Sequence, residues 1–197
     1  MKKLSLGLII LGVLLMFYPL CAEIYARSEQ EKLSALFDSN VPAVSERFDE
    51  DTPVAVQPAD VSSSNTEFSE AKIEIKAIGL SAVVVRGTTL LDLARGPGWY
   101  VESALPGRGN TAIAGHRTMY GAWFRKLDLL KENDLIKITF AGRVYSYQVE
   151  EVFVVAKDDW SVIDPCGYPA LTLTTCHPVG RASQRLVVRA ALVNNHV

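Results

Sequence analysis

The sequence is poor in cysteine and histidine and has no excess of positive charge. Its 197 residues include three of each, and 20 Lys and Arg are balanced by 22 Asp and Glu, so that the formal net charge is −2. A nucleic-acid-binding domain normally carries a basic patch or stripe, which this balance argues against. Neither the spacing of a zinc finger nor a glycine-rich phosphate loop is present. We therefore expect no nucleic-acid partner and no cofactor.

Charge is also absent from the segment that follows the first three residues. Two lysines precede an uncharged run over residues 4–22 that is rich in Leu, Ile and Val. Roughly 20 apolar residues can cross the hydrocarbon layer of a membrane, and the lysines orient the segment with residues 1–3 in the cytoplasm. We predict an uncleaved transmembrane signal-anchor at 4–22, with the remaining chain outside the cell. The alternatives are a cleaved signal peptide, whose apolar region is normally shorter, and a lipidated Cys21.

Residues 23–69 have two kinds of composition. The first part, at 28–37, spaces its apolar residues as a helix does, which predicts a juxtamembrane helix that extends the anchor. The second part, at 38–69, scatters prolines among Ser, Glu, Asp, Ala and Val without any period, which predicts a disordered linker. A folded domain is expected at 70–197.

This domain contains short apolar or alternating runs that are separated by turn residues. Ala141 and Gly142 form a tight turn between two alternating runs, which predicts a β-hairpin. Strands are expected at residues 72–76, 81–85, 111–114, 135–140, 143–156, 171–176 and 185–193, and short helices at 90–94 and 122–130. About seven or eight short strands with few helices predict an all-β domain, either a closed barrel or a sandwich.

The predicted strand at 171–176 ends on Cys176, just before Pro178. A strand exit can hold a nucleophile rigidly, but a thiol with its ordinary pKa of about 8.5 needs a neighbouring base or cation to form a thiolate at neutral pH. A disulfide with Cys166 is the structural alternative, because disulfides persist outside the cell. A zinc site would have His116 and the two cysteines as ligands and would lack a fourth, so no metal is expected.

Among the histidines, His116 is the candidate base. It follows the predicted strand at 111–114 and thus projects from a second strand exit. His177 is adjacent to Cys176, but neighbours on a strand point to opposite faces, and His196 lies in the C-terminal tail. Taken alone, a histidine at a strand end also fits a structural role.

An acyl-transfer reaction also requires a group that stabilises an oxyanion. Arg185 begins the strand after the cysteine loop, and a hairpin at this loop would return it to the neighbourhood of Cys176. Arg181, in the middle of the loop, and Arg189, further along the same strand face, are the alternatives. Each arginine also fits a solvated charge at a sheet edge.

In this order along the chain, His116, Cys176 and Arg185 resemble the catalytic residues of the sortase family, the membrane-anchored cysteine transpeptidases of bacterial surfaces. The run Leu-Thr-Thr-Cys ending at Cys176 fits the family's TLxTC motif, and residues 109–117 fit its histidine segment. The resemblance covers roughly residues 73–193. It is greatest to class E, because of the run GHRTMYGA that contains His116 and the run TCHP that contains Cys176; class D is second.

The resemblance implies a closed sortase-type β-barrel of about eight strands and a secreted substrate protein with a C-terminal LPxTG-like or LAxTG-like sorting signal. It implies that Cys176 attacks the threonine carbonyl to form a thioacyl-enzyme. His116 would protonate the leaving glycine amine, and Arg185 would hold the oxyanion. The acceptor would be an amine of a peptidoglycan precursor. Substrate contacts are expected from Thr175, His177 and Ile163.

Other functions remain open on the sequence alone. A cysteine hydrolase would use water as the acceptor, and a class D or pilin-type sortase would use a different amine. An anchored β-domain without catalytic activity would use Cys176 as a structural residue. The role of Cys166, which precedes the cysteine strand, is not assigned by the resemblance.

Overall fold

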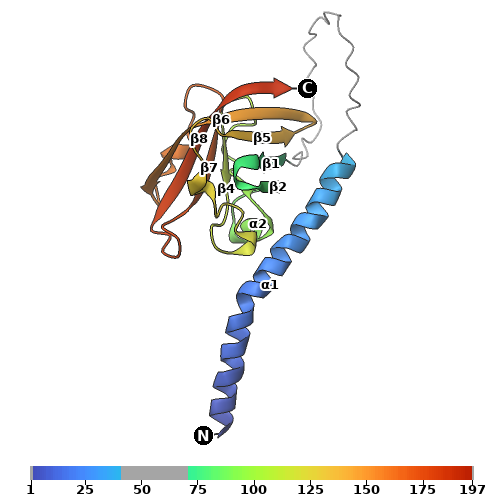
Figure 1. Ribbon diagram of the computed structural model, residues 1–197, viewed down its shortest axis with the longest axis vertical. Helices are drawn as coiled ribbons and strands as arrows, with labels where there is room; N and C mark the ends of the chain where they lie inside the picture. The colour runs from blue at the N-terminus through green and yellow to red at the C-terminus, as the bar shows by residue number, and fades with distance from the viewer. Residues whose placement is uncertain (1, 41–70, 197) are drawn as a thin grey trace, which may run out of the picture.

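The computed structural model describes residues 2–40 and 71–196, which form a long helix and a β-barrel (Figure 1). The strands are β1 (Ala71–Ile75), β2 (Leu80–Arg86), β3 (Gly98–Trp99), β4 (Asn110–Ala114), β5 (Leu135–Phe140), β6 (Arg143–Ala156), β7 (Ala170–His177) and β8 (Gln184–His196). The helices are α1 (Lys2–Asn40) and α2 (Leu90–Arg95), and the 3₁₀ turns are η1 (Lys76–Ile78), η2 (Tyr120–Ala122), η3 (Leu127–Leu129) and η4 (Trp160–Ile163).

The eight strands close into a barrel in the order β1-β2-β3-β4-β7-β8-β6-β5. The β2–β3 and β4–β7 pairs are parallel, and the other pairs are antiparallel. Closure leaves no long unpaired edge, which would otherwise be open to pairing with other chains. The prediction of a closed all-β barrel is confirmed, and a sandwich is excluded.

The interior is filled by residues that alternate along the strands. On β7, Leu171 and Leu173 are fully buried in the same core cluster as Ile113 of β4 and Val188 of β8. Because successive side chains of a strand point to opposite faces, Thr172, between the two leucines, faces the outside of the barrel. Burying each large apolar side chain contributes about 1.5–3 kcal/mol. This alternation decides which face of β7 carries functional groups.

The hairpin between β5 and β6 has the predicted boundaries. Ala141 and Gly142 have φ angles of 50° and 74°, the combination of a two-residue turn whose twist matches that of the flanking strands. The register pairs Phe140 with Arg143 across this turn. The predicted helical turn at 90–94 is also present, as α2, with a capping box between Thr89 and Asp92.

The predicted helix at 122–130 is wrong, because this segment forms 3₁₀ turns around η2 and η3. The amide of Phe124 donates to the carbonyl of His116 at 3.1 Å rather than to an acceptor four residues earlier. Phe124, Leu127 and Leu130 are all buried, and their spacing of three residues matches the 3₁₀ repeat. Packing of these three side chains into the barrel therefore overrides the α-helical pattern.

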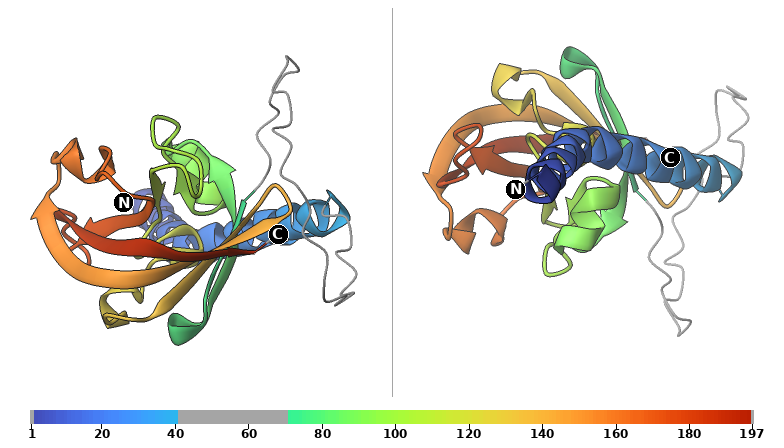
Figure 2. Two further views of the ribbon diagram at one scale, coloured as in Figure 1. Left: turned by 90° about the horizontal axis from the view of Figure 1, so that it is seen from above. Right: turned by 90° about the horizontal axis from the view of Figure 1, so that it is seen from below.

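Helix α1 runs without interruption past the predicted helix at 28–37. Its C-terminal part lies along one side of the barrel (Figures 1 and 2), and its N-terminal part extends beyond the barrel (Figure 1). Its Leu33 and Phe37 form a small buried cluster with Val83 and Val85 of β2. The helix includes residues 38–40, which were assigned to the linker; the rest of the predicted linker, residues 41–69, and residue 70 of the predicted domain lie outside the described residues.

The structure does not confirm the predicted transmembrane helix at 4–22. Among the residues that the structure describes, no helix combines the length and the apolar character that crossing a membrane requires. The side chains of residues 4–11, 14 and 15 lie outside that description.

Candidate active site

The candidate site lies where β4, β7 and β8 meet. Parallel pairing of β4 with β7 brings their carboxyl ends to the same end of the barrel, with Ala114 opposite Thr174. The amide of Gly115 donates to the carbonyl of Thr174 at 3.1 Å, so the pairing continues to the residue before His116. The antiparallel β7–β8 pair places Arg185 opposite Cys176. The topology thus brings His116, Cys176 and Arg185 to adjoining strand ends.

Strand alternation assigns Cys176 to the outer face of the barrel. Leu171 and Leu173 point into the core, and Cys176 has the opposite parity on the same strand. Directly paired residues share a face, so Arg185 lies on the same outer face as Cys176. Cys176 is half-buried, and neither it nor Cys166 is in a disulfide. Instead, the Cys166 thiol lies 3.4 Å from the carbonyl of Tyr168.

His116 is half-buried, and its Nε2 is buried without a hydrogen-bond partner among the described residues. Burial lowers the pKa of this imidazole below its ordinary value, because a charged ring loses hydration when it is covered. The ring is therefore neutral at neutral pH and able to accept a proton from a thiol. Gly115 precedes it for a steric reason: a Cβ there would lie 2.6 Å from the Phe124 ring.

Arg185 has its backbone opposite Cys176, while its guanidinium contacts the loop before β8. Its Nη1 donates to the carbonyls of Gln184, at 3.1 Å, and Ala182, at 3.4 Å. Arg189, the alternative on the same face, donates instead to the carbonyl of Val162 in η4 at 3.1 Å. Of the two, Arg185 is the one paired directly with the cysteine.

The three residues expected to contact substrate are placed differently from one another. Thr175 is buried, and its hydroxyl donates to the carbonyl of Gly115 at 2.7 Å, so it holds the two strand ends together rather than offering a surface. His177 is half-buried and Ile163 is the half-buried last residue of η4. Of the three, His177 and Ile163 retain exposed surface.

Arg117 is a residue of the site that the sequence reasoning did not single out. It is only 4% exposed, and its Nη2 forms an ion pair with Asp128 at 3.0 Å. Its Nη1 lies 3.4 Å from the carbonyl of Cys176 and 3.1 Å from Nδ1 of His177. A guanidinium can only donate, so Nδ1 of His177 is the acceptor in this contact. In the sequence, only the position of Arg117 beside His116 could have indicated a role in the site. Burial of its charge depends on the tertiary fold.

The outer face of β7 is bordered by η4 and by the segment after β3. Thr174 Oγ1 lies 3.0 Å from the hydroxyl of Tyr100, whose ring meets that of Trp160 edge-on at 6.2 Å. The Asn110 amide donates to the carbonyls of Val162 and Asp164 at 3.0 and 2.9 Å. These contacts fasten η4 beside the face that carries Cys176. Among the described residues, no group of His, Cys, Asp and Glu is arranged to hold a metal ion.

Comparison with known proteins gives consistent matches. A family model described as the sortase domain matches residues 73–193. Sortase A of Bacillus anthracis is 33% identical over 123 residues, which cover 62% of this chain and 59% of that protein. The chain thus spans less than two thirds of this curated relative.

Two solved structures have the same fold as this chain. A sortase D5 transpeptidase of Clostridium perfringens is 34% identical with a TM-score of 0.59, covering 64% of this chain and 79% of that one. Sortase E of Streptomyces avermitilis is 33% identical with a TM-score of 0.59, covering 66% and 90%.

Proposed function

The chain belongs to the sortase family, and on that premise we propose that it is a cysteine transpeptidase. Its substrate would be a secreted protein with a C-terminal LPxTG-like or LAxTG-like signal, cut between Thr and Gly and joined to a cell-wall amine. The observation that carries this proposal is the convergence of Cys176, His116 and Arg185 on adjoining strand ends.

In the first half of the proposed reaction, His116 takes the proton of the Cys176 thiol. The thiolate attacks the threonine carbonyl carbon, and the carbonyl oxygen gains negative charge. Arg185 stabilises this oxyanion, and collapse of the intermediate breaks the Thr–Gly bond while His116 returns the proton to the leaving glycine amine. The product is a thioester on Cys176. The lowered pKa of His116 supports this role, since the neutral ring is the form that accepts the first proton.

In the second half, an acceptor amine attacks the thioester and loses a proton to His116. A new amide forms, and the thiol of Cys176 regains its proton. No redox step occurs, and every proton that moves is taken up and returned by His116. Arg185 must exchange the carbonyls of Ala182 and Gln184 for the substrate in both halves, which couples substrate binding to the loop before β8.

Within the family, we propose class E with an LAxTG-type signal. Support comes from residues 115–122 and 175–178, whose sequences resemble that class. We also propose that residues 4–22 anchor the chain and that the barrel lies outside the cell, because two lysines precede this uncharged run. The hydroxyl contact of Tyr18 with Tyr120 would then hold the loop after His116 close to the membrane surface.

The test is peptide ligation by the full chain. Labelled LAxTG and LPxTG peptides are incubated with a glycine-type amine, and ligated product is separated by chromatography. We expect product with the unmodified chain and with Cys166→Ala, and none with Cys176→Ala. Absence of product from the unmodified chain contradicts the proposal. A product distribution that does not respond to the amine would instead indicate a cysteine hydrolase.

A further inference from the structure

The loop that follows His116 has a backbone conformation that requires support. Tyr120, Gly121 and Ala122 have φ angles of 48°, 79° and 43°, a region that residues with a side chain rarely occupy. Such residues persist only where surrounding structure holds them, and they cluster at functional sites. At Gly121 no other residue fits, because a Cβ would lie 2.5 Å from the Trp123 ring.

Helix α1 contacts this loop directly, although the two are far apart in the sequence. Oε2 of Glu23 accepts a hydrogen bond from the amide of Gly121 at 3.0 Å. The other carboxylate oxygen, Oε1, accepts from Nε of Arg27 at 2.9 Å, which fixes the side chain on the helix. One turn earlier, the Tyr18 hydroxyl lies 2.8 Å from that of Tyr120. Glu23 and Tyr18 therefore hold two consecutive residues of the strained loop.

The loop transmits this support to His116 through two contacts. The Tyr120 ring lies against the His116 ring, with the centroids 5.6 Å apart and the planes inclined by 34°. The carbonyl of His116 accepts from the amide of Phe124 on the far side of the loop at 3.1 Å. A shift of residues 120–122 would thus move or uncover the imidazole.

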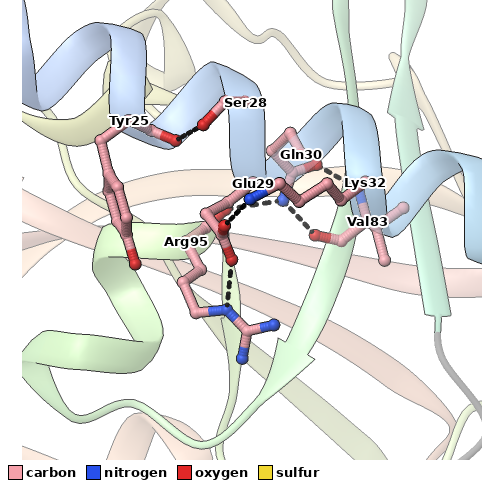
Figure 3. Close-up of polar contacts among 7 residues, drawn as sticks. All are labelled: Tyr25, Ser28, Glu29, Gln30, Lys32, Val83 and Arg95. Atoms are coloured by element: carbon pink, nitrogen blue, oxygen red, sulfur yellow. Dashed lines mark hydrogen bonds and ion pairs between the residues drawn. The ribbon is translucent and has the colours of Figure 1, made fainter.

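The helix is fixed to the barrel at a second place, independently of the loop. The side-chain amide of buried Gln30 pairs with both backbone groups of Val83 and also donates to the carbonyl of Arg95 (Figure 3). Glu29 adds an ion pair with Arg95 at 3.2 Å. This attachment holds α1 against the barrel, so that Glu23 and Tyr18 are positioned to contact the loop.

We propose that Glu23 and Tyr18 are positioning residues for His116, acting through Gly121 and Tyr120. The kinetic consequence rests on the proposed function, in which the imidazole must stay within hydrogen-bond reach of the thiol and of the leaving amine. Removing the support lets the ring sample other positions and admits water to it, while the peptide-binding face on β7 and η4 is untouched.

The kinetic test compares Glu23→Ala with Glu31→Ala in the full chain. Both remove a carboxylate from α1, but Glu31 lies at an exposed position of the helix. We expect Glu23→Ala to lower kcat roughly 10- to 100-fold with little change in KM, because small misplacements of catalytic groups have effects of this size. Glu23→Gln keeps an acceptor for Gly121 and should restore most of the rate, and Glu31→Ala should leave it unchanged.

A second readout does not depend on activity. The titration of the His116 ring is followed by NMR in the full chain; in Glu23→Ala its lowered pKa should rise toward the ordinary value of 6.5, because the ring gains water. An unchanged titration together with an unchanged kcat would overturn the proposal. If Glu23→Ala does not fold, Tyr18→Phe provides the same comparison. An unmodified chain that is inactive on every peptide contradicts the proposed function, yet the titration still decides the positioning role.

Discussion

At the scale of single residues, His116 presents an unusual buried atom. Its Nε2 has no hydrogen-bond partner among the described residues, and a catalytic role is one of the explanations for such an unsatisfied group. Cys176 and Arg185 are only partly buried at the adjoining strand ends. Burial favours the neutral form of the His116 ring, which is the form that the proposed reaction requires.

Burial of His116 predicts a pH dependence of stability. Its folded-state pKa lies below the unfolded value, so between the two values the unfolded chain binds more protons, and the free energy of unfolding decreases as the pH falls. From about pH 7.5 to about pH 5.5, urea unfolding should show a larger loss of stability for the unmodified chain than for His116→Gln, which cannot titrate. Equal losses in the two proteins would show that the ring is not protonated differently on unfolding.

At the scale of elements, side-chain contacts join the ends of β4 and β7 in addition to the backbone pairing of the two strands. The Thr175 hydroxyl bonds to the Gly115 carbonyl, and Arg117 connects the end of β7 with Asp128 in η3. These contacts fix the separation of the two strand exits. They also explain why Thr175 belongs to the framework of the site rather than to its surface.

Arg117→Met tests this connection. The methionine keeps much of the apolar volume but removes the donors to the Cys176 carbonyl and to His177. We expect a loss of about 1–3 kcal/mol in the free energy of unfolding, the range for hydrogen bonds to charged groups and for leaving acceptors unpaired, together with slower alkylation of Cys176 if the strand end shifts. Arg125→Met, at an exposed position of the same loop, is the matched control. An unchanged free energy of unfolding would mean that the contacts of Arg117 make no net contribution to stability.

At the scale of the whole molecule, the C-terminal part of α1 is attached to one side of the barrel (Figures 1 and 2). Gln30 substitutes for a neighbouring strand by bonding to both the amide and the carbonyl of Val83. Gly96 leaves the necessary room, since a Cβ there would lie 2.2 Å from the Gln30 amide nitrogen. The surface of the barrel therefore has room for the Gln30 side chain of α1 at this place.

Gln30→Ala should weaken the attachment of α1 to the barrel. The amide and carbonyl of Val83 would lose their side-chain partner, and an unsatisfied buried polar group costs about 1–3 kcal/mol. We expect a lower thermal unfolding midpoint and faster hydrogen exchange at Val83, with Glu31→Ala, at an exposed position of α1, as the control. Hydrogen exchange at Val83 that does not change would show that the helix is not held by this contact.

Much of the barrel was predictable because its strands carry local signals. The hairpin at 135–156 follows from alternation on both sides of Ala141 and Gly142, and each strand's inward face follows from its own apolar period. The segment at 122–130 was misassigned because its apolar spacing fits both helix types. The contact that decides between them, Phe124 with His116, depends on the folded barrel.

The sequence by itself determined the class of fold, the family resemblance and the three candidate catalytic residues, because strand periodicity and short motifs are properties of neighbouring residues. Only the tertiary structure decided that Arg117 is buried beside the end of β7 and that Thr175 is buried with its hydroxyl bonded to Gly115. It alone also showed that α1 holds the loop after His116. These features join segments that are far apart along the chain, and such contacts exist only after the barrel closes and its surfaces meet.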